Sequence, residues 1–282
     1  MTALRVLHPG ALMTVQDRGR RGTAHLGVAR SGAADRTSLL LANRLVGNAE
    51  HAAGLEVLGG GAVLEATADA VVAVTGARCE VSVNDAPHGR NVALGLSAGD
   101  VLRLGPAQIG VRVYVGLRGG VQVPEVLGSR SYDQLGDLGP APLLAGAPIP
   151  RGGHALTSPV WDEVPTPDPT ATPVLRVAAG PRLGWLDDGL RALLAGSWTV
   201  SSDSDRTGVR LDGAPVRRRA GDLASEGTVV GGIQVPPDGR PILLGPDAGV
   251  TGGYPLVAVV VDADVDAIGQ LAPGTQVRFR AR

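Results

Sequence analysis

Short runs of β-branched and apolar residues, each ended by Gly, Asp or Asn, dominate the first half of the chain. They predict strands over residues 55–58, 62–65, 71–75, 80–83, 101–104 and 111–117. No long helix separates these runs, so they do not resemble repeated βαβ units. Close spacing of this kind favours an antiparallel sheet rolled into a barrel or a sandwich.

One stretch of the first half has helical periodicity instead. Residues 34–46 place Leu39, Leu40 and Leu45 mostly on one side, which predicts an amphipathic helix. Ser31 or Asp35 can cap its start, and the Gly-Asn pair at 47–48 ends it.

The second half repeats this organisation. Residues 185–194 have helical spacing, with two aspartates near the start, where the helix dipole favours acidic side chains. Strands are predicted over residues 197–201, 208–211, 233–235, 242–244, 256–261 and 276–280. Five prolines between 159 and 173 mark a semi-rigid linker or an edge segment. We therefore expect an N-terminal domain over 1–160, a proline-rich linker over 161–173 and a C-terminal domain over 174–282.

Composition narrows the class of protein. The 282 residues are 44% hydrophobic, carry a net charge of −1 and include one cysteine and no lysine. Balanced charge argues against broad attraction to nucleic acid or to an anionic membrane. Because Cys79 is the single cysteine, the chain cannot form an intrachain disulfide. Its apolar neighbours in the sequence predict an inert thiol in the core. Without a signal sequence or a membrane-length apolar run, we expect a soluble, cytoplasmic protein.

Polar residues separated by glycines form a first cluster near the N-terminus. Asp17 could bind backbone amides or an ion-pair partner, and Arg18 could grip a carboxylate or a phosphate. His25 could transfer a proton near neutral pH. The alternative is structural: Asp17 pairs with Arg18, and His25 is a satisfied barrel residue.

Two further polar residues lie in apolar surroundings. Asn43 stands among leucines on the predicted helix, and Glu56 stands within an apolar strand. A polar group on an apolar face needs a partner, so each either fixes a neighbouring loop or belongs to a site.

A second polar cluster lies in the C-terminal half. Residues 225–241 and 251–255 combine backbone-fixing Gly and Pro with isolated polar side chains, which is typical of binding loops. Pro-Asp-Gly at 237–239 is equally a common turn. Asp205 and Arg206 lie in a polar turn before a strand, where a structural turn is the alternative. Metal-binding, nucleotide-loop and serine-hydrolase motifs are absent from the sequence.

Together these clusters resemble the KipA family, also known as the C subunits of 5-oxoprolinase and, in older naming, as allophanate hydrolase subunit 2. The resemblance is carried in order by residues 9–20, 25–28, 31–36, 41–48, 55–57, 127–131, 202–208, 225–227, 233–239 and 251–255. Where family members often have Asp-Arg-Gln-Thr or Asp-His-Pro-Val, this chain has Asp247-Ala248-Gly249-Val250. A bulky or cationic side chain is therefore missing beside the 251–255 loop.

The resemblance implies a mostly β protein with two cyclophilin-like β-barrel domains, each with short helices. It also implies two partners, namely the KipI-like and the LamB/YcsF-like subunits of the same enzyme. The three together would hydrolyse 5-oxoproline to glutamate using ATP with Mg²⁺. Two alternatives stay open: a non-catalytic antagonist of a KipI-type kinase inhibitor, and a carboxyltransferase component of a biotin-dependent urea carboxylase-like system. Biotin enters only under the last alternative, on another chain, because biotin attaches to lysine.

Site residues follow from motif membership and residue type, with arginines supplying charge to an activated lactam and aspartates orienting water or metal-bound nucleotide. No residue is assigned as a metal ligand. The predicted catalytic residues are Asp17, Arg18, His25, Asp35, Asp205, Arg206 and Asp238. The predicted substrate-binding residues are Ser31, Asn43, Glu56, Gln234, Thr251, Gly252, Gly253 and Tyr254.

Overall fold

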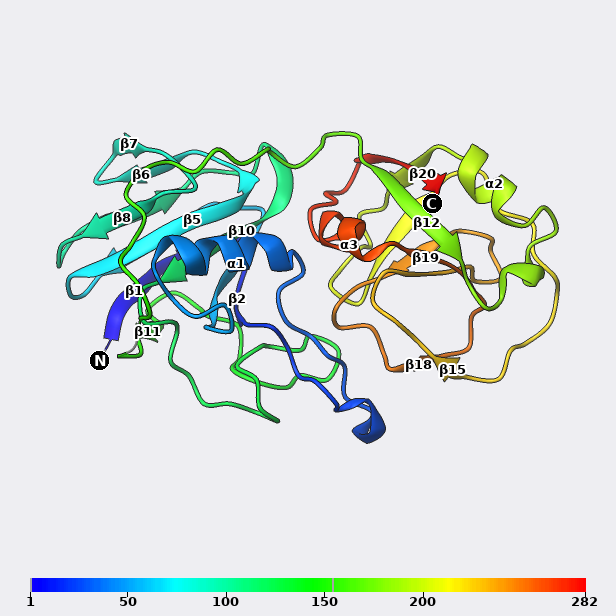
Figure 1. Cartoon of the computed structure of the whole chain (residues 1–282), viewed down its shortest axis with the longest axis horizontal. Coiled ribbons are helices and arrows are strands. Elements are labelled where there is room, and N and C mark those ends of the chain that lie inside the picture. The colour runs from blue at the N-terminus through cyan, green and yellow to red at the C-terminus, as the bar shows by residue number, and fades with distance from the viewer. Residues whose placement is uncertain (1, 154) are drawn as a thin grey trace. The chain divides into compact units, whose positions relative to one another are not determined.

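Strands form most of the regular structure in both parts of the chain (Figure 1). The computed structural model describes residues 2–153 and 155–282. They divide into two compact units. The first comprises the chain up to residue 20 with residues 35–133 and 137–169, and the second comprises residues 21–34, 134–136 and 170–282. The second unit thus includes two segments that lie far from its main part in the sequence.

Eleven described strands build the first unit as two antiparallel sheets. Their orders are β11-β1-β4-β9-β6-β7 and β2-β3-β10-β5-β8. The strands are β1 (Thr2–Pro9), β2 (Leu12–Gln16), β3 (Gly54–Leu58), β4 (Ala62–Ala66), β5 (Ala70–Arg78), β6 (Val81–Val83), β7 (Ala86–His88), β8 (Ala93–Leu96), β9 (Val101–Leu104), β10 (Ile109–Leu117) and β11 (Pro148–Pro150).

Period-two alternation gives each sheet of the first unit an apolar face. Val57, Val74 and Val115 belong to one fully buried core together with Leu4 and Leu64 of the six-stranded sheet. On the opposite face of the five-stranded sheet, helix α1 (Arg36–Leu45) packs against β5 and β10. A Cβ at Gly116 would lie 2.7 Å from the carbonyl oxygen of Ala42, so only glycine lets the helix approach β10 this closely.

A buried polar row crosses the five-stranded sheet on the helix-covered face. Strand register aligns Thr14, Glu56, Tyr114 and Thr75 on four neighbouring strands. The Tyr114 hydroxyl donates to Glu56 Oε2 at 2.7 Å and accepts the backbone N–H of Asp35 at 2.8 Å. Arg112 Nε lies 3.2 Å from Glu56 Oε1. Burial and the nearby Glu56 carboxylate raise the pKa of Tyr114 well above its usual range, so this hydroxyl keeps its proton and donates.

The second unit contains a closed seven-stranded barrel with the order β12-β19-β16-β17-β14-β13-β20 and a separate β15-β18 pair. Helix α3 (Asp262–Ile268) is fixed to the barrel by Asp264, which accepts two hydrogen bonds from the Arg176 guanidinium at 2.9 and 2.6 Å. The elements are β12 (Val174–Ala179), α2 (Leu190–Ala195), β13 (Trp198–Val200), β14 (Gly208–Asp212), β15 (Glu226–Gly227), β16 (Gly232–Gln234), β17 (Ile242–Leu244), β18 (Thr251–Gly252), β19 (Leu256–Val260), α3 (Asp262–Ile268), β20 (Gln276–Ala281) and the short 3-10 helices η1 (Ala24–Leu26) and η2 (Leu183–Trp185).

The mostly β prediction is confirmed, and the predicted strands match observed strands closely. The second unit contains a closed barrel. In the first unit, the described strands form two sheets that no strand pairing joins. The first helix forms, and Asp35 rather than Ser31 caps it, accepting the Ser38 N–H at 3.0 Å. Cys79 is buried and its pKa is raised to about 11, mainly by desolvation, as expected for an inert thiol.

The continuous helix predicted over residues 185–194 is wrong. Residues 183–185 form η2, residues 186–189 are not helical, and α2 begins only at Leu190. Gly189 has a φ of 55°, in the left-handed region that a continuing helix does not use. Periodicity alone therefore joined two short helices that this glycine separates.

Part of the proline-rich segment lies along the first unit as an edge. The Ala93 N–H donates to the Val160 carbonyl at 2.9 Å, and the Val164 N–H donates to the Asn91 carbonyl at 2.9 Å. The unit extends to Pro169, within the predicted linker. No helix among the described residues is both long and apolar enough to span a membrane.

The polar row gives a stability prediction. Tyr114→Phe should lower the free energy of unfolding by about 2–3 kcal/mol, because it leaves the Glu56 carboxylate and the Asp35 N–H buried with fewer partners. Urea unfolding measures the change. Tyr254→Phe is the control, since Tyr254 is 43% exposed and its change should stay within about 0.5 kcal/mol. Equal effects of the two substitutions would show that the row contributes no such stability.

Candidate functional site

The two Gly- and Pro-rich loops of the second unit lie together. Glu226 of β15 pairs with Gly252 of β18, and Gly227 pairs with Thr251. The side-chain amide of Gln234 donates from Nε2 to the Tyr254 carbonyl at 3.2 Å. A Cβ on Gly252 would lie 3.0 Å from the same nitrogen. Gln234 is therefore held against the 251–254 backbone; we call residues 225–228, 234 and 251–254 the loop platform.

The loop platform combines a fixed floor with exposed polar groups. Gln234 is buried, whereas Thr251 and Tyr254 are exposed. Glu226 accepts hydrogen bonds from Arg182 Nε and Nη2 at 2.9 and 2.8 Å, which raises the pKa of Arg182. The Thr228 hydroxyl donates to the Gly249 carbonyl at 2.5 Å. Such a surface offers amide, hydroxyl and backbone groups that suit a small polar ligand.

The second unit also contains a buried ion pair. Arg206 Nε donates to Asp247 Oδ2 at 2.7 Å and Nη2 donates to Oδ1 at 3.0 Å, in a bidentate arrangement. Arg206 is 3% exposed and Asp247 is 0% exposed. The Asp247 carboxylate also accepts the Gln134 N–H at 3.0 Å, and Arg206 Nη2 donates to the Gly32 carbonyl at 2.6 Å. The pair thus fastens residues 21–34 and 134–136 to the barrel.

Ser31 shows that the fastened segment is strained. Its φ is 56°, a left-handed conformation that non-glycine residues seldom adopt, and its N–H donates to the Pro246 carbonyl at 2.9 Å. Gly32, the acceptor of the Arg206 bond, follows directly with a φ of 91°. Surrounding bonds must hold such a backbone, and Arg206 supplies one of them.

Asp17 forms a separate hub in the first unit. Its carboxylate accepts the hydroxyls of Ser129 and Ser131 at 2.6 Å each, and the N–H groups of Arg130 and Gly19 at 2.7 and 2.8 Å. The structural alternative in which Asp17 pairs with Arg18 is therefore wrong, because serine hydroxyls and backbone N–H groups donate to the Asp17 carboxylate. Arg18 instead lies 3.8 Å from a carboxylate oxygen of Glu50 on the surface.

The remaining predicted residues have local roles in the structure. Asn43 donates to the Ala52 carbonyl at 2.7 Å, and Glu56 belongs to the buried row. Asp205 accepts the N–H groups of Thr207 and Gly208, and Asp238 accepts the N–H of Arg240, so both shape turns. His25 is exposed in η1, not a buried barrel residue, with Nδ1 2.9 Å from the Gly22 carbonyl.

The structure brings together Gln234, Gly252 and Tyr254 in the second unit, and Asp35 with Glu56 in the first. Their catalytic or substrate-binding roles stay predictions. No group of three or more His, Cys, Asp or Glu side chains able to hold a metal ion occurs in the described part of the chain, and His154 lies outside it.

Several residues that organise the sites were not predicted. Tyr114 and Arg112 lie two apart on β10, and this spacing places both on the face of Glu56. Ser129 and Ser131 also lie two apart, within the 127–131 motif. A spacing of two residues places both side chains on the same face of an extended strand, and this was the sequence signal that could have identified them. Asp247 carried no comparable signal, because its partner Arg206 lies 41 residues away.

Comparison with known proteins identifies the family. Residues 26–281 match the family described as carboxyltransferase domain, subdomain A and B. The chain belongs to this family.

Relatives within the family have two kinds of name. The chain is 34% identical to the C subunit of 5-oxoprolinase from Escherichia coli strain K12, over 98% of this chain and 90% of that protein. It is 31% identical to the urea amidolyase of Lachancea kluyveri, over 98% of this chain but 17% of that protein.

Two solved structures share the fold of this chain. The crystal structure of TTHA0988 matches 99% of this chain with a TM-score of 0.91 at 36% identity, and the chain spans 56% of that protein. The Kluyveromyces lactis urea amidolyase matches 98% of this chain with a TM-score of 0.90 at 30% identity, and the chain spans 18% of it.

The buried ion pair gives a prediction for this family member. Arg206→Gln should lower the free energy of unfolding by about 3–5 kcal/mol, because the Asp247 carboxylate stays buried without its cation. Chemical denaturation followed by circular dichroism measures the loss. The matched control is Arg240→Gln, which breaks the exposed Arg240–Asp212 pair and should cost about 0–1 kcal/mol. A loss for Arg206→Gln no larger than the control's would contradict the assigned role.

Proposed function

We propose that this chain is the C subunit of an ATP-dependent 5-oxoprolinase. It would hydrolyse 5-oxo-L-proline to L-glutamate together with KipI-like and LamB/YcsF-like subunits, and it would be inactive alone. The observation that carries this proposal is the 34% identity to the C subunit of the Escherichia coli enzyme, over 98% of this chain and 90% of that relative. The C subunit of Haemophilus influenzae 5-oxoprolinase is similar at 33% identity.

The loop platform is the part of this chain that we propose contacts the lactam. Attack on a lactam carbonyl places negative charge on its oxygen, and fixed hydrogen-bond donors stabilise that charge. The Gln234 amide is such a donor, because its contact with the Tyr254 carbonyl uses one N–H of a group that has two. Arg182, which directly precedes η2, supplies a guanidinium that is oriented by Glu226 of the platform. Both features support a substrate-positioning role.

We assign ATP and Mg²⁺ to the assembled complex rather than to a site in this chain. The described carboxylates fit a metal-bound nucleotide poorly: Asp17 accepts four hydrogen bonds from serines and backbone. Asp205 and Asp238 accept backbone N–H groups of their own turns. One oxygen of each of these two carboxylates is therefore engaged within this chain.

A second candidate function has its own support. The family description and the similarity to urea amidolyases favour a carboxyltransferase component of a biotin-dependent system. The sequence has no lysine, so biotin would have to be carried by another chain.

Reconstitution separates these functions. We expect ATP-dependent release of glutamate from 5-oxoproline when the chain is co-expressed with its KipI-like and LamB/YcsF-like partners, and none when any one of the three is omitted. Avidin-sensitive turnover would instead support the carboxyltransferase function. A tight complex of the KipI-like partner with this chain that turns over nothing in any combination would support an antagonist of a KipI-type inhibitor.

The platform can be tested within the active complex. Gly252→Ala should lower kcat/KM about tenfold, because the new methyl group presses on the Gln234 amide and displaces a positioned donor. Gly153→Ala is the control outside the platform, where nothing lies within 4 Å of an added Cβ, and its activity should be unchanged. Full activity of Gly252→Ala would remove the platform from the site while leaving the assignment to 5-oxoprolinase intact.

A further inference from the structure

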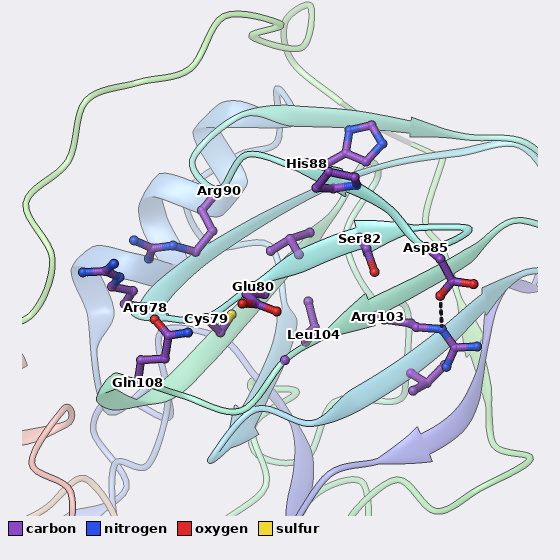
Figure 2. Close-up of a pocket in the computed structure, with 14 residues that line it drawn as sticks. Arg78, Cys79, Glu80, Ser82, Asp85, His88, Arg90, Arg103, Leu104 and Gln108 are labelled. Carbon is purple, nitrogen blue, oxygen red and sulfur yellow. Dashed lines mark hydrogen bonds and ion pairs between the residues drawn. The ribbon is translucent and has the colours of Figure 1, made fainter.

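A pocket of about 790 Å³ opens in the first unit, apart from every predicted site residue. It lies over β6, β7 and β9 and the turn that follows β5, and its volume is within the range of small-molecule sites. Figure 2 shows Arg78 and Arg90 at one end, the Asp85–Arg103 pair at the other, and Glu80 and Ser82 between them.

The arginine end of the pocket already holds a carboxylate of this chain. Arg90 is ion-paired with Asp168 Oδ1, and Arg78 Nη1 lies 3.7 Å from Asp168 Oδ2. Arg90 is itself fixed, because Nη1 donates to the carbonyls of Gly76 and Ala77 at 3.0 and 3.3 Å. Arg90 is therefore positioned, and Arg78 is close enough to share the Asp168 carboxylate, which comes from the proline-rich segment and is not itself a lining residue. Two guanidinium groups that share one carboxylate form a carboxylate-binding site at this end of the pocket.

The rest of the pocket offers charges of both signs. Arg103 Nε lies 3.2 Å from Asp85 Oδ1, and both side chains are largely exposed. Among the described residues, no ion-pair partner lies at the Glu80 carboxylate, which is available to a cation. Three arginines and two acidic residues line the pocket, leaving one positive charge in excess when Asp168 is not counted.

We propose that this pocket binds a small acidic amino acid, which displaces Asp168. One ligand carboxylate takes the place of Asp168 between Arg78 and Arg90. The ammonium group pairs with Glu80. The largely exposed Arg103 side chain turns from Asp85 toward Glu80 and meets the second carboxylate. Such a ligand has one net negative charge, which matches the excess positive charge of the lining, whereas a plain dicarboxylate would leave Glu80 uncompensated. The proposal is independent of the proposed function.

Calorimetric titration of the full chain with L-glutamate tests this site. We expect saturable binding that Arg78→Gln weakens at least about tenfold, as the loss of a charge-assisted contact requires. Asp168→Asn should instead tighten binding several-fold, because it removes the competing carboxylate. Arg5→Gln is the matched control: Arg5 is 54% exposed and ion-paired, close to the 53% of Arg78, but lies outside the pocket. It should leave binding unchanged.

Ligand analogues check the assigned chemistry. Glutarate, which lacks the ammonium group, and L-glutamine, which lacks the second carboxylate, should each bind more weakly than L-glutamate. Three results would overturn the proposal: no binding to the unmodified chain or to Asp168→Asn, equal binding of inorganic phosphate, or weaker binding by Asp168→Asn. Because the titration needs no partner protein, failure here leaves the 5-oxoprolinase assignment untouched.

Discussion

The Arg206–Asp247 pair is the interaction on which the assembly of the second unit depends. Two charges with almost no exposed surface are costly to bury unless each satisfies the other and its remaining hydrogen-bonding groups find partners. Here those partners belong to segments distant in the sequence, the Gly32 carbonyl and the Gln134 N–H. The requirement to satisfy a buried charge therefore becomes a requirement that residues 21–34 and 134–136 lie on the barrel. The strained backbone at Ser31 is tolerated within that framework.

The first unit follows the same logic with other residues. The buried Glu56 carboxylate pairs with Arg112 and accepts the Tyr114 hydroxyl. The same hydroxyl accepts the N–H of Asp35, which caps helix α1. Asp17 joins the chain after β2 to the loop around Ser129 and Ser131. In both places an acidic side chain that resembles a catalytic group is enclosed by donors. The second unit's loop platform, with an anchored amide beside exposed groups, is a more suitable surface for substrate.

The sequence predicted local structure well because local structure depends on neighbours in the chain. Alternation located most strands, and the Asp35 cap could be anticipated because its acceptor oxygen and the Ser38 N–H are three residues apart. The prediction of one helix over 185–194 was wrong because hydrophobic periodicity does not indicate the left-handed conformation of Gly189. The 225–241 and 251–255 loops were grouped as one cluster by their composition, and the pairing of β15 with β18 brings them together. Partners such as Asp17 and Ser131, 114 residues apart, depend on tertiary packing that no spacing rule encodes.

Hydrogen–deuterium exchange tests most directly whether the buried pair holds the two distant segments. In the unmodified chain, the Ser31 and Gln134 amides should exchange slowly, because they donate to the Pro246 carbonyl and to Asp247. In Asp247→Asn, peptides covering residues 21–34 and 134–136 should exchange much faster and should lose more protection than barrel strands β16 and β19. Unchanged protection of both segments in that variant, or equal loss throughout the barrel, would contradict the account.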